Sequence, residues 1–348
     1  MKMIKVRILT NDFHTFEPYR KQYAELYHRG IELVQPDAKS YDLTMIGHSV
    51  FQDKKCGSLA KSTEKGLEYL SKIDGPYILV DGQDSHSVIG SYEVFKDSNA
   101  IALLKDTMLK DRNLYKEEWV AGRWFWGKSE DWGIDGQNYK PKDWDSYSDR
   151  IHLSGKNWLG VQDYQFNDYK NIQKFFDLSL MFQYPHAECH EFELKPSQDY
   201  YYNQYRKQII DTCTNSPFMI AKLYNGQRLD PQKWAQYQYM SKVILSPFGY
   251  GSYGAPRDIM AVSMGSILLK ESLDFIDTYP NVYENEKTYI ACKNDFSDLE
   301  EKIEYCVLNF DELRNYLVDN MIREYKEKYH TTYLADYTVS LFKKLNIL

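Results

Sequence analysis

Short apolar runs, each ending in a polar or glycine-containing loop, alternate with segments of helical periodicity along most of this chain of 348 residues. In the first part, residues 4–9, 42–46 and 77–80 have the character of strands, and residues 17–28 and 62–70 have the spacing of helices. Alternation of this kind is typical of a mostly parallel sheet covered by helices on both faces. The pattern therefore predicts an α/β fold.

The same alternation resumes near residue 175 and predicts a second α/β half. A chain of this length is too long for one ordinary core and suits two domains. The expected strands of the second half are residues 175–182, 218–223, 243–245 and 266–269, and its expected helices are residues 200–212, 231–239, 256–264, 295–308, 311–329 and 333–345.

The stretch 119–158 interrupts the alternation, because it holds six of the seven tryptophans and is rich in Gly, Asp, Lys and Ser. We interpret it as loops and irregular pairing near a domain junction. The expected organisation is a first domain over residues 1–170 that includes this insert, a second domain over residues 171–325, and a C-terminal helix within residues 326–348 that packs back on the first domain.

Charge and cysteine content exclude several classes of protein. The chain has 43 basic and 50 acidic residues and no basic run, whereas a nucleic-acid binder needs clustered Lys and Arg. The five cysteines are scattered without a CxxC pair, which argues against a disulfide framework or a zinc site and for a reducing compartment. No apolar run approaches the roughly 20 residues of a membrane span. We expect a cytoplasmic protein, or one of the host cytoplasm if the gene is viral, and leave peripheral attachment to a membrane open.

The segment 241–270 carries the most chemical information, since it has the pattern of a strand, a glycine-rich loop, a helix and a second strand. Glycines at 249, 251 and 254 let backbone approach a ligand closely, and Pro256 suits the first position of a helix. The loop would present free N–H groups of a helix N-terminus beside Arg257. This arrangement predicts a site for a phosphate or diphosphate, and a tight turn without a ligand is the competing interpretation.

The three glycines also spell G-x-G-x-x-G, and Glu271 follows at the spacing of the acidic residue in that fingerprint. A NAD-dependent oxidoreductase is therefore an alternative. We rank it second, because the expected helix is short and too little sequence follows for the rest of a dinucleotide domain.

The segment 241–270 resembles the C-terminal donor-binding signature of exostosin-like and group-1-type glycosyltransferases of the GT-B fold. That signature consists of a strand, Ser/Cys-Pro-x-Gly, a loop of small residues, Arg, a helix, then Gly and an apolar strand. The matching positions are Ser246, Pro247, Gly249, Ser252, Arg257, Ala261, Gly265 and Ile267. The resemblance extends over roughly residues 200–325. It implies two Rossmann-like domains facing a central cleft, followed by C-terminal helices.

The resemblance also implies an activity. The chain would be a hexosyl- or pentosyltransferase that moves a sugar from a nucleoside diphosphate sugar, with a UDP-sugar favoured, to a hydroxyl of a glycan or other acceptor. Transfer would be inverting and metal-independent, without a cofactor, in a monomer or weak dimer. The donor-binding candidates are Ser246, Gly249, Gly251, Ser252, Tyr253, Gly254, Arg257, Asp258 and, on the preceding helix, Arg206.

One position departs from the signature. The family has an acidic residue three positions after the arginine, often assigned to the ribose hydroxyls, whereas this chain has Met260 there and Asp258 nearby. Ribose recognition is therefore open, and a degenerate transferase-like protein that only binds nucleotides is a further alternative.

The acceptor and the general base are expected on loops at the carboxyl ends of the first-half strands. Three loops offer candidates, namely Asp12 with His14, then His48, and then Asp81, Asp84 and His86. We favour the third loop and Asp84, because two carboxylates close together can split their pKa values and leave one as a base. A local Asx turn is the competing interpretation.

Aromatic and acidic residues of the insert give weaker signals. Trp124, Trp126 and Trp132 could stack on acceptor sugar rings, and packing between domains is the competing interpretation. Asp143-Trp144-Asp145 has the D-x-D spacing of metal-dependent transferases, but it does not follow a clear strand. We therefore predict no metal.

Overall fold

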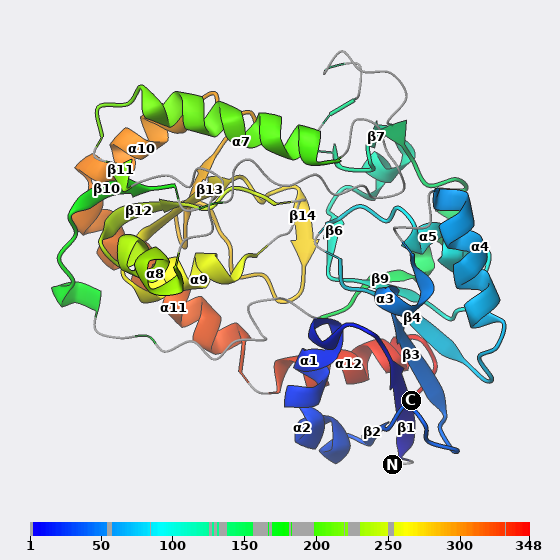
Figure 1. Ribbon diagram of the computed structural model, residues 1–348. Helices are drawn as coiled ribbons and strands as arrows, with labels where there is room; N and C mark the ends of the chain where they lie inside the picture. The colour runs from blue at the N-terminus through cyan, green and yellow to red at the C-terminus, as the bar shows by residue number, and fades with distance from the viewer. Residues whose placement is uncertain are drawn as a thin grey trace.

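The computed structural model contains two parallel sheets, each covered by helices, that lie side by side (Figure 1). The structure describes residues 3–53, 58–83, 85–124, 127–128, 131, 138–155, 166, 169–180, 182, 198–218, 220–221, 230–249, 254–330 and 332–348.

The first sheet has six parallel strands whose central members are completely buried. Its spatial order is β2 (Ile31–Val34), β1 (Ile4–Leu9), β3 (Leu43–Gly47), β4 (Tyr77–Asp81), β5 (Leu103–Lys105) and β9 (Ile151–Leu153). The helices of this half are α1 (Phe13–Lys21), α2 (Tyr23–His28), α3 (His48–Phe51), α4 (Leu59–Leu70) and α5 (Ser91–Lys96). Side chains alternate across the sheet, so Met45 and Ile78 pack with α1 on one face, and Ile46 packs with α3 and α5 on the other.

The second sheet has five parallel strands. Its spatial order is β11 (Ile220–Ala221), β10 (Phe176–Ser179), β12 (Ser241–Leu245), β13 (Ile267–Glu271) and β15 (Ile290–Cys292). The helices of this half are α7 (Gln198–Thr214), α8 (Pro231–Tyr239), α9 (Pro256–Ser263), α10 (Leu299–Leu308) and α11 (Phe310–Lys328). Apolar side chains from β10, β12, β13 and β15 and from α7, α9, α10 and α11 form one continuous core.

Both sheets have the same doubly wound order, in which the second strand lies outside the first and the third, fourth and fifth follow on the other side. The order therefore reverses between β1 and β3 in one half, and between β10 and β12 in the other. In such sheets, ligands bind outside the carboxyl ends of the strands at this point of reversal. The predicted fold class, α/β with two Rossmann-like halves and C-terminal helices, is confirmed.

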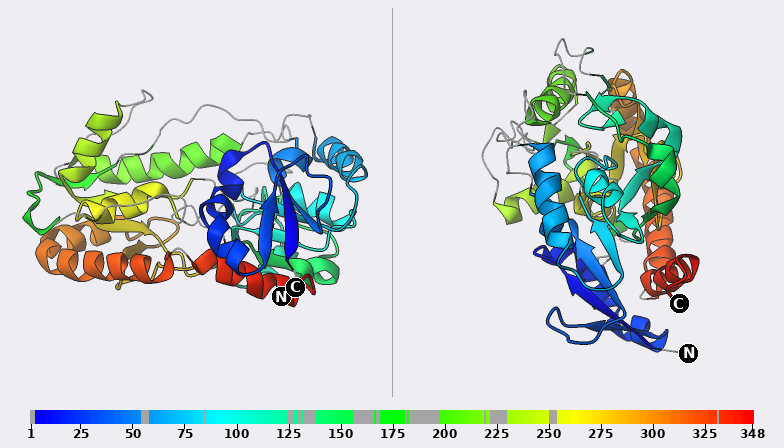
Figure 2. Two further views of the ribbon diagram at one scale, coloured as in Figure 1. Left: turned by 90° about the horizontal axis from the view of Figure 1, so that it is seen from below. Right: turned by 90° about the vertical axis from the view of Figure 1, so that its right-hand side faces the viewer.

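The two halves are joined by a short antiparallel pair and by the last helix. Strand β6 (Thr107–Leu109) pairs with β14 (Ile276–Thr278), so backbone hydrogen bonds cross from one half to the other. Helix α12 (Tyr333–Lys344) continues from α11 and lies against the first sheet (Figures 1 and 2). Its Leu334 and Phe342 belong to the same core as Val6 and Met45. Both chain termini therefore lie at the first half.

The structure differs from the sequence prediction mainly at short elements. The single helix expected over residues 17–28 is two helices that meet at Gln22, and the first begins at Phe13 because the Asp12 side chain accepts a hydrogen bond from the His14 amide. The stretch 119–158 contributes β9 to the first sheet, which was not predicted. It also contains β7 (Trp119–Val120), β8 (Asn138–Tyr139), α6 (Trp144–Tyr147) and the 3-10 turn η4 (Ser148–Arg150); η1 (Arg112–Lys116) and η6 (Tyr169–Asn171) lie outside it.

Among the helices that the structure describes, none is both long enough and apolar enough to cross a bilayer.

Candidate active site

The loop after β12 leads directly into α9, as the sequence predicts for the segment 241–270. Pro256 occupies the first turn of α9, and the Asp258 carboxylate accepts a hydrogen bond from the Ala255 amide at 3.1 Å. The amino end of α9 therefore lies at the carboxyl edge of the second sheet, beside the point where the strand order reverses. Gly249 and Gly254 border this loop, whereas the predicted donor residues Gly251, Ser252 and Tyr253 lie outside the described residues.

Asp258 is completely buried in a network that fixes the start of α9. One carboxylate oxygen accepts from the Tyr283 hydroxyl at 2.8 Å and lies 3.2 Å from the Lys270 ammonium. The other oxygen accepts from the Ser246 hydroxyl. Both oxygens are thus committed within the protein. The carboxylate therefore positions the loop, and donor binding by Asp258 itself stays a prediction that this burial weighs against.

Arg257 is half-buried and held at the first turn of α9 by two hydrogen bonds. Its Nε donates to the Ser246 hydroxyl at 2.7 Å, and its Nη2 donates to the Pro247 carbonyl at 2.6 Å. The same Ser246 hydroxyl therefore links Arg257 to Asp258. The guanidinium group consequently has a fixed place beside the N–H groups of a helix end, which is where an anion is stabilised.

Arg206 on α7 is a second cation near this loop, and it is not on a solvated helix face. Its side chain is buried, with the guanidinium carbon 3.9 Å from the ring centre of Tyr202 and 5.0 Å from that of Phe182. Burial lowers the pKa of Arg206 to about 9, and the positive charge of Arg257 adds to this lowering although Tyr202 opposes it. An anion that contacted both guanidinium groups would offset their repulsion.

Glu271, at the carboxyl end of β13, was not among the predicted donor residues and yet organises the site. Its carboxylate accepts from the Phe248 amide at 3.0 and 3.2 Å and from the Tyr205 hydroxyl of α7. Burial raises the pKa of Glu271, although Lys270 acts in the opposite direction. This residue therefore ties α7, which carries Arg206, to the loop that precedes Arg257. Its position at a strand end was the available sequence signal.

In the first half, the three loops that were predicted to carry the base meet at one edge of the sheet. The Asn11 amide donates to the Ser49 hydroxyl at 3.1 Å, which links the loop after β1 to α3. The side-chain amide of Gln52 donates to the Ile89 carbonyl at 3.1 Å, which links α3 to the loop after β4. The first of these contacts spans the reversal of strand order between β1 and β3.

Two of the predicted bases in the third loop are buried and committed. Asp81 forms an ion pair with Lys105 at 3.0 Å and also accepts from the Ser91 hydroxyl and the Gln83 amide. Burial lowers the pKa of His86 to about 3, with further lowering from Arg123 and Lys105. The role of Asp81 or His86 as the base stays a prediction, and the burial of both side chains weighs against it. The favoured candidate, Asp84, lies outside the described residues.

The remaining first-half candidates have simpler surroundings. Asp12 caps α1, because one carboxylate oxygen accepts from the His14 amide and the other accepts from the Thr15 hydroxyl. His14 itself is exposed on the first turn of α1. Trp124 is half-buried, while Trp126 and Trp132 lie outside the described residues.

Phe275, just before β14, is where the two predicted sites come together. Its ring packs 4.6 Å from Trp124 and 6.0 Å edge-on from His86, both of the first half. It also lies 6.0 Å edge-on from Phe248, in the loop before α9. The loop that was predicted to bind the donor and the loop that was predicted to supply the base are therefore separated by one aromatic side chain.

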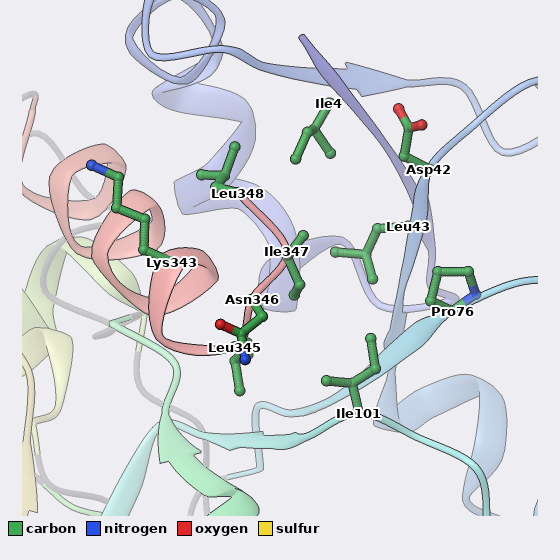
Figure 3. Close-up of a pocket in the computed structure, with 10 residues that line it drawn as sticks. All are labelled: Ile4, Asp42, Leu43, Pro76, Ile101, Lys343, Leu345, Asn346, Ile347 and Leu348. Atoms are coloured by element: carbon green, nitrogen blue, oxygen red, sulfur yellow. The ribbon is translucent and has the colours of Figure 1, made fainter. Parts of the chain in front are cut away.

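An apolar pocket of about 450 Å³ lies elsewhere in the molecule (Figure 3). It is at the amino ends of β1 and β3, opposite to the edge described above, and the last residues of the chain form one wall. Its position argues against a nucleotide site, because doubly wound sheets bind ligands at the carboxyl ends. The lining residues are Ile4, Asp42, Leu43, Pro76, Ile101, Lys343, Leu345, Asn346, Ile347 and Leu348.

The D-x-D sequence lies at the start of α6. Asp143 has a left-handed backbone conformation, Trp144 is buried and stacks on Tyr115, and Asp145 pairs with Lys116 at 2.8 Å. Within the residues that the structure describes, no group of three or more His, Cys, Asp or Glu side chains is arranged to hold a metal ion.

No protein-family model and no curated protein matches this chain. Among solved structures, it is similar to a glycosyltransferase from Rickettsia africae ESF-5, with 10% identity, 99% of each chain covered and a TM-score of 0.47. It is also similar to an α1,3-fucosyltransferase with GDP-fucose, with 12% identity, 99% of this chain and 90% of that one covered, and a TM-score of 0.43. A third is T4 phage BGT with its UDP-glucose substrate, with 10% identity, full coverage of both chains and a TM-score of 0.42. Because these TM-scores are below 0.5, we argue the function from this chain's own residues.

Proposed function

We propose that this protein is a glycosyltransferase that takes a sugar from a nucleoside diphosphate sugar and transfers it to a hydroxyl of an acceptor. One observation carries the proposal. Phe248, in the loop that leads to Arg257 and α9, and His86, in the loop after β4, both pack against Phe275, so carboxyl-edge loops of the two doubly wound sheets meet there. A donor and an acceptor bound at these two edges would face each other.

The second half suits the diphosphate of the donor. The amino end of α9 offers N–H groups and the positive end of the helix dipole, and Ser246 and Pro247 hold Arg257 beside it. Arg206 brings a second positive charge close to Arg257. Groups placed in this way would stabilise the charge that develops on the leaving diphosphate. We favour a UDP-sugar as donor and a hexosyl or pentosyl group as the sugar moved.

We further propose that transfer is inverting. We also propose that it needs no metal ion, because the helix end and the two arginines supply the charge stabilisation that a divalent cation gives in other transferases. Treatment with EDTA should therefore leave the rate of donor turnover unchanged. The measurement is release of UDP from a UDP-sugar before and after chelation. A drop of tenfold or more that Mg²⁺ or Mn²⁺ restores would contradict this part of the proposal.

The structure weighs against the oxidoreductase alternative. The dinucleotide fingerprint belongs to the first strand–helix turn of its domain, whereas the glycines here follow β12, the third strand of its sheet. Its acidic residue should reach a ribose, but Glu271 is completely buried and binds the Phe248 amide and the Tyr205 hydroxyl. We therefore retain the transferase.

Substitution of Arg257 tests the proposal. Across a panel of UDP- and GDP-sugars, Arg257→Ala should lower kcat/KM for donor hydrolysis or transfer by about 100-fold or more, since a fixed cation at the leaving group is lost. The matched control is Lys233→Ala, which removes an exposed cation of α8 in the same half and should leave turnover unchanged.

Three other results would contradict parts of this proposal or favour one of the alternatives. Unchanged turnover in Arg257→Ala would remove the assigned role of this loop. Binding of UDP with no turnover over a broad acceptor panel would favour the degenerate nucleotide-binding protein, for which Met260 in place of an acid is the sequence argument. Thermal stabilisation by NAD but not by UDP or GDP would favour the oxidoreductase.

A further inference from the structure

His48 lies beside Asp81 at the carboxyl edge of the first sheet. Strands β3 and β4 pair in parallel with Ile46 opposite Leu79 and Gly47 opposite Val80. His48, the first residue of α3, directly follows Gly47, and Asp81 directly follows Val80, so the two residues come next at the ends of neighbouring strands. Because side chains alternate along a strand, Asp81 lies on the face to which Leu79 points, and α3, which begins with His48, packs on that same face through Phe51.

Lys105 extends this row by one strand. Asp81 is opposite Lys105 in the pairing of β4 with β5, and their side chains form the buried ion pair at 3.0 Å. The row is therefore an imidazole, a carboxylate and an ammonium group on three neighbouring strand ends. Asp81 and Lys105 are completely buried, whereas His48 is half-buried at the open end of the row.

The position of His48 in the fold is the one where a doubly wound sheet binds ligands. It follows β3, and the reversal of strand order lies between β1 and β3. Its neighbour Ser49 accepts a hydrogen bond from the Asn11 amide across that reversal. At the far end of α3, Gln52 donates to the Ile89 carbonyl of the third loop. His48 is thus held between the other two loops that were predicted to carry the base.

The Asp81 carboxylate is kept ionised beside His48. Burial alone would raise the pKa of Asp81, but Lys105, the charge of His48 and hydrogen bonds from Ser91 and the Gln83 amide hold the pKa below its usual value. Asp81 therefore stays ionised, and an ionised carboxylate stabilises a neighbouring imidazolium. Among the described residues, the charged groups on elements around α3 include Asp12, Asp53 with Lys65, Asp81 with Lys105, and Glu93.

We propose that His48 is the general base of the transfer reaction and that Asp81, fixed by Lys105, is the residue that positions and stabilises it. This inference rests on the proposed function. The acceptor oxygen attacks the anomeric carbon of the donor sugar as its proton passes to an imidazole nitrogen of His48. The new carbon–oxygen bond forms while the bond to the diphosphate breaks, and the electron pair leaves with the diphosphate. The imidazolium then returns its proton to water.

The experiment uses the full-length protein and donor hydrolysis, in which water is the acceptor, so that no acceptor needs to be known. UDP-glucose and GDP-fucose are the probes, and release of UDP or GDP is the readout. His48→Gln keeps hydrogen-bonding capacity but cannot act as a base, and it should lower kcat by about 100- to 10,000-fold. The Kd of UDP, measured by calorimetry, should stay within twofold of the wild-type value. The matched control is His28→Gln, an exposed histidine of α2 that should change neither quantity.

Two further readouts separate a base from a structural residue. The acid limb of the kcat profile against pH should disappear in His48→Gln, and free imidazole should restore part of the rate of His48→Ala. Thermal melting of each variant checks that it is folded. If His48→Ala does not fold, the pH profile of His48→Gln still tests the inference. Suppose that the wild-type protein turns over the donor and that His48→Gln keeps at least a third of its kcat and the same acid limb. This result would overturn the role of His48 and leave the proposed function intact. Absence of UDP or GDP binding by the wild-type protein would instead overturn the proposed function.

Discussion

At the residue scale, each half holds a loop at its carboxyl edge by a buried ion pair between an aspartate and a lysine. Asp81 pairs with Lys105 in the first half, and Asp258 pairs with Lys270 in the second; all four side chains are buried. Each lysine also donates to a loop carbonyl, at 2.9 Å for Lys105 and 3.1 Å for Lys270. Removing one partner of such a pair leaves a buried charge, so these aspartates are structural supports for neighbouring functional residues.

The sequence could not reveal that Asp81 and Asp258 are held in buried ion pairs. Asp81 stands at a strand end, and Asp258 stands beside an arginine. A ligand-binding acid is equally expected at both positions. The strand register places Lys105 opposite Asp81, and the packing of α9 on β13 places Lys270 against Asp258, so only the tertiary structure reveals these pairs. By contrast, the place of Arg257 at the amino end of a helix was predictable from Pro256 and the preceding glycines.

Burial of His86 predicts a pH dependence of stability. Its pKa is about 3 in the folded protein, because burial disfavours the charged form, against about 6.5 in an unfolded chain. The unfolded state therefore binds the extra proton first. Stability should be fully present above about pH 6.5 and fall between pH 6.5 and 3 by up to about 1.4 kcal/mol per pH unit.

The measurement is urea unfolding at a series of pH values for the wild-type protein and for His86→Gln, compared with His28→Gln as an exposed control. The slope should be reduced in His86→Gln and preserved in His28→Gln. An unchanged slope in His86→Gln would show that His86 does not carry this dependence.

At the element scale, the long periodic helices and the longer apolar strands were predictable, and several three-residue strands were not. Residues 311–329 were expected as a helix, and α11 spans Phe310–Lys328. Strands β5, β9 and β15 have only three residues each, which is too few to show a period of two. They form because the neighbouring strands offer unpaired backbone groups, which is information from the tertiary structure.

Packing of α4 on α3 gives a prediction in which two effects oppose each other. Gly66 lies in the middle of α4, where Gly→Ala normally stabilises a helix by about 1 kcal/mol. A Cβ at this position would lie 2.3 Å from the backbone oxygen of Phe51, the last residue of α3. We expect the clash to prevail and Gly66→Ala to destabilise the protein by about 1–3 kcal/mol.

Chemical denaturation measures this change, with Glu64→Ala on the exposed face of α4 as the control. Because α3 begins with His48, Gly66→Ala should also reduce turnover more than Glu64→Ala does. A stabilised Gly66→Ala variant would mean that the two helices separate easily.

At the scale of the whole molecule, the end of the chain completes the core of its beginning. Helix α12 packs its apolar side on the first sheet, and Arg29 of the first half forms an ion pair with Asp336 at 2.7 Å. Tyr337 of α12 stacks on Tyr279, which follows β14 and so belongs to the junction between the halves. The first half is therefore complete only after α12 has packed, and it is linked to the second half at this point.

Truncation of a side chain on α12 tests this dependence. Phe342→Ala should lower the free energy of unfolding by about 3–5 kcal/mol, because a buried ring is lost. Amide hydrogen exchange should show loss of protection in β1 and β3 before β12 and β13. Leu308→Ala, an exposed apolar residue of α10, is the control and should have an effect within about 0.5 kcal/mol. Loss of protection confined to the second half would contradict the packing described here.

The central claim is that a diphosphate binds against the amino end of α9 and Arg257, at the edge of the second sheet that faces the first half. A crystal structure of the protein grown with UDP or a UDP-sugar tests this most directly. We predict that the phosphate oxygens contact the Arg257 guanidinium and backbone amides between Ser246 and Arg257. A nucleotide found instead in the apolar pocket at the amino ends of β1 and β3, or phosphates that avoid Arg257, would contradict it.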